Sequence, residues 1–321
     1  MREHLAGRGV AATVEPWVHA YHRAIRDELP AWPKVSAIVP TRDHVDVLRT
    51  CVEGLLQRTD YPGIELIIAN NDSREPETLA YFEELRADPR VRIFDYPGAF
   101  NFSAINNAAI AVSTGEIVLL LNNDIEMIDA GWLKQMVKHA VRPEVGAVGA
   151  KLLYPDNTMQ HGSVVLGMNG VAGHLHVGVP HDSPGYFGWL RIAHNVSGVT
   201  AACLAMRRTV FDETGGLDEV NLKVAFNDVD LCMKITEKGY EIIWTPEATL
   251  YHWESKSRGN DMSAEHFGRF QGEVAYMRQR WGARLDRDPF FNPNLSLATA
   301  HPVVAFPPRR AVPWQPFLKP A

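Results

Sequence analysis

Along the chain, short apolar runs alternate with segments whose apolar residues recur once per helical turn. The run Val35–Val39 predicts a strand, and the apolar pairs that recur from Val47 to Leu56 predict an amphipathic helix after it. The alternation continues as far as Leu153. It is typical of a mostly parallel sheet covered by helices on both faces, so we expect an α/β fold with a Rossmann-like central sheet.

Gly, Pro and short polar loops mark the boundaries of the other elements. Pro76 suits the first turn of a helix, and Gly115 and Gly239 suit helix ends. From His161 to Trp189 the chain is rich in Gly and His, which predicts irregular structure and short antiparallel strands. The further predicted strands are Glu65–Asn70, Val91–Phe94, Glu116–Leu121, Gly146–Leu153 and Glu241–Trp244, and the further helices are Pro76–Leu85, Ser103–Val112, Ala130–Ala140, Asp228–Lys238 and Ala264–Trp281.

The composition narrows the class of protein. The 321 residues are 46% hydrophobic and 22% charged, which is typical of a globular chain, and the formal net charge is −6. Because such a chain has no basic field for a polyanion, we expect no nucleic-acid partner. Cys51, Cys203 and Cys232 are widely spaced within apolar patterns, which indicates buried thiols in a reducing compartment.

The sequence contains no obvious membrane or export segment. No apolar run reaches the roughly 18 residues that span a bilayer, and Met1–Pro30 has no signal-peptide core. We therefore expect a cytoplasmic protein, and peripheral association at the inner face of the cell membrane is left open. The pattern predicts no oligomeric state.

The signatures of several large enzyme classes are missing. The loop after the first strand reads Pro40-Thr41-Arg42-Asp43 instead of G-x-G-x-x-G, and there is no Walker-type G-x-x-x-x-G-K. These absences disfavour dinucleotide oxidoreductases and P-loop NTPases. The chain also lacks H-E-x-x-H and G-x-S-x-G, which disfavours the commonest metalloproteases and α/β-hydrolases.

Polar residues follow the predicted strands at their carboxyl ends, where open α/β sheets bind ligands. Asp124 follows a buried strand directly and is well placed to bind a hard divalent cation beside a substrate phosphate. Taken alone, Asn122–Asp124 also fits a turn that caps the next helix. The strand ends carry Thr41, Asp43, Asn70, Asp72, Asn122, Asn123 and Asp124.

A second acidic candidate lies at the start of a later helix. Asp228 is flanked by apolar residues, and a carboxylate at the edge of a cleft can take a proton from a hydroxyl nucleophile. The alternative is an N-cap, which is the commoner role of an Asp at a helix start. We expect Asp230 to be a supporting or solvated group.

In their order and spacing, the motifs resemble those of family 2 glycosyltransferases of the GT-A fold, particularly bacterial rhamnosyltransferase-like enzymes of O-antigen and other surface polysaccharide biosynthesis. The resemblance covers about Val35 to Ser257. It rests on Ile38–Asp43, Ile68–Ser73, Phe100–Ser103 with Asn106-Asn107, Leu121–Asp124, Ser197–Cys203, Gly215–Glu219, Asn227–Asp230 and Leu250–His252.

This resemblance implies a domain organisation. Residues 35–257 would form the GT-A domain, with a mostly parallel nucleotide-binding half to about 125 and a smaller, partly antiparallel acceptor-binding half from about 126. Residues 1–34 would be an N-terminal helical extension. Residues 258–321 would be a C-terminal helix and a Pro-rich tail.

The resemblance also implies roles for individual residues. Asp124, the last residue of a variant D-x-D motif, would bind Mg²⁺ or Mn²⁺ with His252 as a further ligand, and Asp228 would be the catalytic base. Ala201, Ala202 and Asn227 would lie on the acceptor side. The nucleotide would contact Pro40, Thr41, Asp43, Asn70, Asp72, Asn101, Asn106, Asn122 and Asn123.

Three positions depart from the family pattern. Asn70 replaces an Asp after the second strand, and Asn122 replaces the first acid of D-x-D, which leaves fewer charges for the cation. Asn227 replaces the Glu that often precedes the base. None of these changes removes Asp228.

The expected reaction is the transfer of a sugar, with inversion, from a nucleotide diphosphate donor to a hydroxyl of a glycan or lipid-linked acceptor. The resemblance favours dTDP-rhamnose or a UDP-hexose as the donor. Two alternatives are a sugar nucleotidyltransferase, which would need a Gly-rich basic loop after the first strand, and a non-catalytic carbohydrate-binding or scaffold protein. Retention of Asp124 and Asp228 speaks against the scaffold.

The histidines of the Gly-rich stretch invite a transition-metal interpretation, because imidazole is a common metal ligand. Their spacing matches no closed zinc site, so we interpret them as acceptor-side or packing residues. Stacking on a sugar and interior packing both remain open for Tyr186, Phe187, Trp189 and Trp253. The histidines are His161, His174, His176, His181 and His194.

Overall fold

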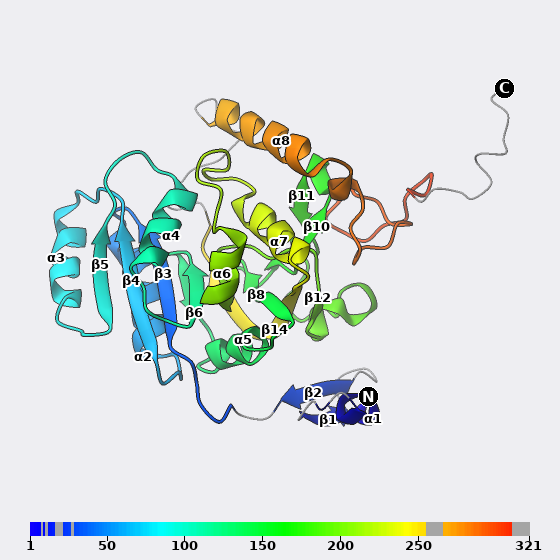
Figure 1. Cartoon of the computed structure of the whole chain (residues 1–321), viewed down its shortest axis with the longest axis horizontal. Helices are drawn as coiled ribbons and strands as arrows, with labels where there is room; N and C mark the ends of the chain where they lie inside the picture. Colours follow the sequence, from blue (N-terminus) through cyan, green and yellow to red (C-terminus); the bar gives the residue numbers. More distant parts are fainter. Residues whose placement is uncertain (8, 10–11, 17–21, 27–28, 255–265, 310–321) are drawn as a thin grey trace.

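A computed structural model describes residues 1–7, 9, 12–16, 22–26, 29–254 and 266–309. Its main feature is a twisted ten-stranded sheet with helices on both faces (Figure 1). One half of the sheet is parallel, in the order β6-β3-β4-β5, as the sequence predicts. These strands are β3 (Val35–Thr41), β4 (Ile64–Asn70), β5 (Val91–Asp95) and β6 (Ile117–Leu121).

The other half of the sheet is mixed. Strand β13 (Cys203–Arg207), which the sequence pattern does not predict, lies antiparallel between β6 and β8 (Val145–Leu153). Strand β14 (Glu241–His252) pairs parallel with β8 and extends well beyond the predicted Trp244. The short strands β7 (Ile125–Met127), β9 (Met159–His161) and β12 (His194–Asn195) complete the sheet.

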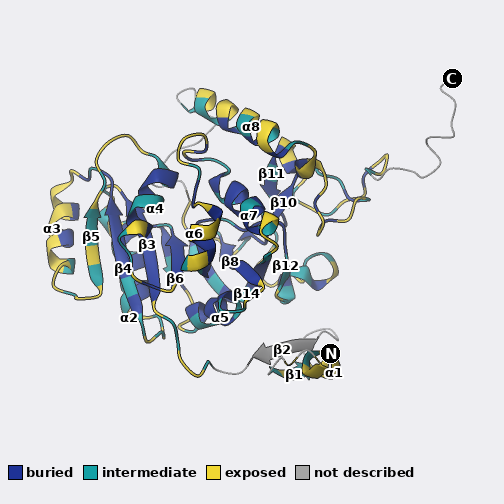
Figure 2. Ribbon diagram, viewed as in Figure 1, coloured by how far each residue is buried: buried dark blue, intermediate teal, exposed yellow. Residues whose placement is uncertain are grey.

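Helices cover both faces of the sheet, and the apolar residues that they turn toward it are buried (Figure 2). Helix α2 (Val45–Gln57) buries Leu48, Cys51 and Leu55. It packs on the same side as α3 (Pro76–Leu85) and α5 (Trp132–Ala140). The opposite side carries α4 (Phe102–Ala111), α6 (Arg208–Thr214) and α7 (Asn227–Glu237).

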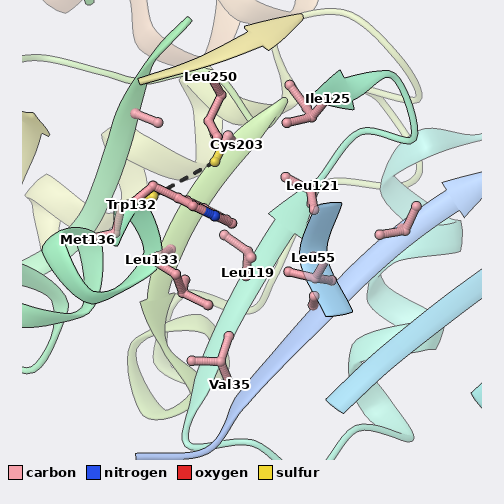
Figure 3. Packing of buried hydrophobic residues seen from close by; sticks show 14 of the residues in the cluster. Val35, Leu55, Leu119, Leu121, Ile125, Trp132, Leu133, Met136, Cys203 and Leu250 are labelled. Carbon is pink, nitrogen blue, oxygen red and sulfur yellow. Dashed lines mark hydrogen bonds between the residues drawn. The ribbon is translucent and has the colours of Figure 1, made fainter. Parts of the chain in front are cut away.

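The core between α5 and the sheet joins the two halves (Figure 3). Trp132 and Met136 of α5 lie against Cys203 of β13, and the Cys203 thiol is 3.8 Å from the Met136 sulfur. All three cysteines are free and buried, as the apolar patterns around them predict. Burial raises the pKa of each thiol, so none of them is an activated nucleophile.

A second, smaller unit covers the carboxyl-end side of the sheet. In the Gly-rich stretch, β10 (Val164–Leu166) and β11 (Ala172–His174) pair antiparallel, and two short 3₁₀ segments, Met168–Gly170 and Tyr186–Arg191, provide the expected irregular structure. Helix α8 (Phe267–Trp281) and the 3₁₀ segment Gly282–Asp286 pack on β10 and α7. None of the helices in these described ranges has the length and apolar character needed to cross a bilayer.

The N-terminal segment differs from the expected helical extension. Its helix α1 (Arg2–Gly7) is short, and β1 (Ala12–Pro16) then pairs antiparallel with β2 (His22–Arg26). The helix ends at Gly7, and Gly9 has a φ of +66°, which is strongly disfavoured for other residues. The proposed boundary at 257/258, the predicted helix start at Ala264 and the tail beyond Arg309 lie outside the described residues.

Candidate active site

A cavity of about 750 Å³ opens at the carboxyl ends of β3 and β6, between the sheet, the β10–β11 pair and the N-terminal ends of α7 and α8. It collects side chains that are far apart in the sequence. Of the predicted site residues, those that line it are Pro40, Thr41, Asn122, Asn123, Asp124, Ala201, Ala202, Asn227, Asp228 and His252.

Three predicted nucleotide contacts hold the loops at the ends of neighbouring strands together: Asp43 links the loops after β3 and β4, and Asn70 and Asp72 link the end of β4 to β5 and to the loop after it. Asp43 accepts hydrogen bonds from the backbone N–H groups of Arg74 (2.6 Å) and Glu75 (2.9 Å). Partial burial opposes ionisation of Asp43, but these N–H groups hold its pKa below the ordinary value. Asn70 donates to Asp95 Oδ1 (2.8 Å), and Asp72 accepts from Gly98 N (2.9 Å). None of the three lines the cavity.

Two further predicted contacts, Asn101 and Asn106, have structural partners at α4. Asn101 caps this helix by accepting from Ala104 N (3.0 Å), and it donates to Glu219 O (2.9 Å). Asn106 is fully buried, and its amide donates to Phe102 O (2.8 Å). Neither side chain lines the cavity. The residue of α4 that does line it is Phe102.

The segment Asn122–Asp124 is fixed on both sides as it leaves β6. The unpredicted strand β13 places Ala202 beside it, and Asn122 N donates to Ala202 O (3.0 Å). Asn123 donates to Thr41 Oγ1 (3.0 Å), which ties the loop to β3. These bonds leave the Asp124 carboxylate at the cavity wall.

Asp124 and His252 form a pair with the properties of a cation site. Strand β7 aligns His252 with Ile125, and His252 Nε2 lies 3.1 Å from Asp124 Oδ1. Asp124 is only 6% exposed, and within the described residues its Oδ1 accepts no hydrogen bond. A buried oxygen without a donor, beside an imidazole nitrogen, is a suitable donor set for a divalent cation. The residues present therefore fit such an ion.

The pair does not amount to a closed metal site. In the described ranges, no three His, Cys, Asp or Glu side chains are grouped so that they could hold a metal ion. Two protein ligands leave most coordination positions of a divalent cation for water or substrate oxygens.

Asp228 lies in the first turn of α7 with its carboxylate directed by backbone groups. Its Oδ2 accepts from Ala201 N (3.1 Å), and its Oδ1 accepts from Val229 N (2.8 Å). The N-cap position belongs to Phe226, which has a φ of +60°. This left-handed residue starts the helix just before Asp228, and such conformations gather at functional sites. The simple N-cap interpretation of Asp228 therefore does not apply.

Asp230, two residues later, faces the interior. It is fully buried, accepts from Trp281 Nε1 (2.9 Å), and pairs with Lys234 and Arg280, each at 3.3 Å. Asp230 thus links α7 to α8, which is the supporting role that the sequence suggests.

Several cavity residues were not predicted as site residues. Gln160 of β9 bonds His252 and Glu254, which lies two residues beyond β14, and Tyr154 lines the cavity from the loop before β9. Arg269 reaches the cavity from α8 and pairs with the buried Glu273 (2.5 Å). In the sequence, what pointed to Gln160 and Glu254 was their closeness to residues already singled out. Gln160 precedes His161, and Glu254 follows His252 by two positions.

His174 lines the cavity, and the buried His161 lies behind it. Their Nδ1 atoms are 3.3 Å apart, and His161 Nε2 faces Thr200 N at 3.4 Å. Burial lowers the pKa of both rings, more strongly for His161, while the nearby Asp228 carboxylate opposes the effect on His174. Both rings are therefore neutral near pH 7, with His174 at the cavity wall and His161 buried behind it.

Comparison with solved structures defines the fold class. A mannosyltransferase from Pyrobaculum calidifontis, solved with GDP-Man and Mn²⁺, aligns with a TM-score of 0.53 and 19% identity over 71% of this chain and 59% of its own. GalNAc-T7, solved with UDP, GalNAc and Mn²⁺, aligns with a TM-score of 0.63 and 13% identity over 83% of this chain and 51% of its own. The expected GT-A glycosyltransferase fold is thus confirmed.

The chain belongs to glycosyl transferase family 2, whose model matches residues 36–215. It is 48% identical to uncharacterized protein y4gI of Sinorhizobium fredii over 92% of this chain and 33% of the relative. It is 40% identical to the O-antigen biosynthesis protein RfbC of Myxococcus xanthus over 92% of this chain and 23% of that relative. The chain thus spans about a third and a quarter of these relatives' lengths.

A more distant relative is named for its reaction. The N-acetylglucosaminyl-diphospho-decaprenol L-rhamnosyltransferase of Mycobacterium tuberculosis is 24% identical over 69% of this chain and 78% of its own length.

Proposed function

We propose that this chain transfers a sugar, with inversion, from a nucleotide diphosphate donor to a hydroxyl of a glycan or lipid-linked acceptor. One observation carries the proposal: the backbone-oriented carboxylate of Asp228 lines the same cavity as the Asp124–His252 pair. A base for the acceptor and a cation site for the donor diphosphate are the two parts that such a transfer needs. Family membership supports both assignments.

In the proposed reaction, Asp228 accepts the proton of the acceptor hydroxyl as its oxygen attacks the anomeric carbon. The bond from that carbon to the diphosphate oxygen breaks on the opposite face, so one displacement inverts the configuration. The Ala201 N–H group fixes the direction of the Asp228 carboxylate before substrate binds. Positioning of this kind lowers the barrier without covalent participation by the protein.

Asp124 and His252 would hold Mg²⁺ or Mn²⁺. When bound there, the cation neutralises the charge that develops on the leaving nucleoside diphosphate. Both solved relatives described above were obtained with Mn²⁺ and a nucleotide or nucleotide sugar, which supports this role. Asn122 and Asn123 contribute no charge, so we expect cation binding to be strongest when a diphosphate supplies further oxygens.

For the donor, we propose dTDP-rhamnose or a UDP-hexose, and for the acceptor a growing glycan on a lipid carrier. The names of the relatives support these classes, since they include an O-antigen biosynthesis protein and a rhamnosyltransferase that acts on a decaprenol-linked sugar. An acceptor of this kind would bring the protein to the membrane surface from the cytoplasmic side.

The test of the base is Asp228→Asn, which keeps the shape of the side chain but removes its basicity. We expect release of UDP from UDP-glucose, or of dTDP from dTDP-rhamnose, by slow transfer to water in the presence of Mn²⁺ to fall by about 100- to 10,000-fold. The affinity for UDP and dTDP should stay within a few-fold of that of the parent.

Asp212→Asn is the matched control, because Asp212 is exposed on α6 and pairs with Arg208 outside the cavity. It should release nucleotide at the parent rate. An Asp228→Asn protein that releases nucleotide as fast as the parent, or that loses nucleotide binding in parallel, would show that Asp228 is not the base.

A further inference from the structure

Gln160 lies at an irregularity in the sheet that directs its side chain toward the cation pair. Strand β9 pairs with β8 through His161 with Leu152 and Met159 with Leu153, so Gln160 is an extra residue between two paired positions. Bulges of this type re-aim a side chain and are over-represented next to active sites. The Gln160 side chain is 4% exposed and lines the cavity.

The partners of Gln160 define which end of its amide faces which group. Its Nε2 lies 3.0 Å from Glu254 Oε2, and its Oε1 lies 2.6 Å from His252 Nδ1. A carboxylate only accepts hydrogen bonds, so the amide nitrogen must face Glu254. The amide oxygen is then left for His252, and Nδ1 of His252 must carry the hydrogen.

Gln160 and Glu254 belong to a series of hydrogen bonds that starts at His252, and Tyr154 is its last member. The Tyr154 hydroxyl hydrogen-bonds the Glu254 side chain. Burial, together with the Glu254 carboxylate, raises the pKa of Tyr154 to about 12, so the phenol remains a hydrogen donor. Glu254 therefore accepts hydrogen bonds from both Tyr154 and Gln160. This leaves the Gln160 oxygen to accept from His252 Nδ1.

The hydrogen on Nδ1 determines what the other ring nitrogen of His252, Nε2, can bind. With the hydrogen on Nδ1, a neutral His252 presents a lone pair at Nε2, which faces Asp124 Oδ1 at 3.1 Å and the Asn122 amide nitrogen at 3.2 Å. The Asn122 amide can donate to this lone pair, but the Asp124 oxygen cannot. Two electron-pair donors, Nε2 and Oδ1, thus converge where a cation would bind.

We propose that Gln160, backed by Glu254, is a positioning residue that fixes the tautomer of His252 and so prepares its Nε2 as a metal ligand. This role rests on the proposed function, because it assigns Gln160 to the cation site of that reaction. Gln160 acts through His252 and touches neither the cation nor the reacting atoms. Outer partners of this kind typically contribute 10- to 100-fold to metal affinity.

The experiment uses two variants of Gln160 and one control. Gln160→Met keeps a side chain of similar length but removes both the donor and the acceptor. The double variant Gln160→Glu with Glu254→Gln exchanges amide and carboxylate, so that residue 254 donates to residue 160, which still accepts from His252. Gln135→Met, on the half-buried side of α5 and outside the cavity, is the matched control.

Two readouts are measured on the full chain. Long-range ¹H–¹⁵N spectra of the metal-free protein, with His252 assigned by comparison with His252→Asn, report which ring nitrogen carries the hydrogen. Mn²⁺ binding in the presence of UDP, dTDP or GDP is followed by electron paramagnetic resonance. We expect the Nδ1–H form in the parent, its loss in Gln160→Met with Mn²⁺ affinity about 10- to 100-fold weaker, and recovery of both in the exchanged double variant.

The outcomes separate this role from the proposed function. A parent that binds Mn²⁺ with none of the nucleotides would overturn the cation site and this role with it. A parent that binds Mn²⁺ while Gln160→Met binds it equally well, or a parent His252 with its hydrogen on Nε2, would overturn the role of Gln160 alone. If Gln160→Met unfolds, failure of the exchanged pair to keep the Nδ1–H form would also overturn it.

Discussion

At the scale of single residues, the site consists of groups that end or begin regular elements. Asp124 follows β6, His252 ends β14, and Asp228 lies in the first turn of α7. The position of Asp124 after an apolar strand and that of Asp228 before an apolar helix made these two residues candidates from the sequence pattern, whereas His252 was implied by the family resemblance alone, because the predicted strand ended at Trp244. Gln160 and Glu254 were not predicted, because their contribution arises from a bulge in β9 and from the pairing of β14, which leave no periodic pattern in the sequence.

The cation site makes a prediction at this scale. Asp124→Asn replaces the carboxylate that faces His252 Nε2 by a neutral amide, so the gain in nucleotide affinity on adding Mn²⁺ should largely disappear, while the affinity without cation should change little. Calorimetric titration of UDP and dTDP with and without Mn²⁺ measures both quantities.

Asp129→Asn serves as the comparison, since Asp129 is exposed and accepts a hydrogen bond from Gly131 N (2.7 Å). It should retain the full effect of Mn²⁺. If Asp124→Asn also retained it, Asp124 would not be a metal ligand.

At the scale of elements, the sequence predicted the parallel half of the sheet and its helices closely, because strong apolar runs and one-sided helices specify them. Helix α3 begins and ends at the predicted Pro76 and Leu85. Strand β13 was missed because Cys203–Arg207 lies beyond Leu153, where the alternation of predicted strands and helices ends, and it pairs antiparallel with both of its neighbours. The full length of β14 was missed because Pro246 and Glu247 interrupt its apolar pattern, and the structure accommodates them with a register shift.

The link between α7 and α8 gives a second prediction. Trp281→Phe removes the N–H donor to the buried Asp230 but keeps an aromatic ring in the core, so the free energy of unfolding should fall by about 1–3 kcal/mol. Chemical denaturation measures the change. Trp253→Phe removes a comparable donor to Glu126 on the surface and should change stability by less than about 0.5 kcal/mol. Equal effects of the two variants would mean that Asp230 does not link the helices.

At the scale of the whole molecule, the smaller unit around the Gly-rich stretch contains histidines that are buried in the neutral state. Burial lowers the pKa of His176 to about 4, and His301 and His194 add to the effect. Its Nε2 accepts from Tyr186 N (3.1 Å), which requires an unprotonated nitrogen. The sequence marked these histidines as unusual, and the fold shows that His161 and His176 are buried.

This burial makes stability depend on pH. Between the ordinary His pKa of 6.5 and the folded value of about 4, the unfolded chain binds more protons than the folded one. The contribution of His176 to the free energy of unfolding is therefore fully present above pH 6.5. It is lost as the pH is lowered toward 4, by up to about 3 kcal/mol. Other buried histidines act in the same direction.

His176→Gln isolates this contribution, because a Gln oxygen can still accept from Tyr186 N but does not titrate in this range. Denaturation curves of the parent and the variant at pH 7.5, 6 and 5 should show a smaller loss of stability in the variant. Identical pH slopes would contradict the assignment of His176 as a buried neutral group.

We propose that one cavity binds a nucleoside diphosphate with the help of a divalent cation and presents a base to an acceptor. The most direct measurement is calorimetric titration of the parent with UDP, dTDP, GDP and CDP, each with and without Mn²⁺. We predict selective binding of UDP or dTDP that Mn²⁺ strengthens. Absence of binding to all four nucleotides, or binding that Mn²⁺ leaves unchanged, would show that the cavity is not a cation-assisted nucleotide site.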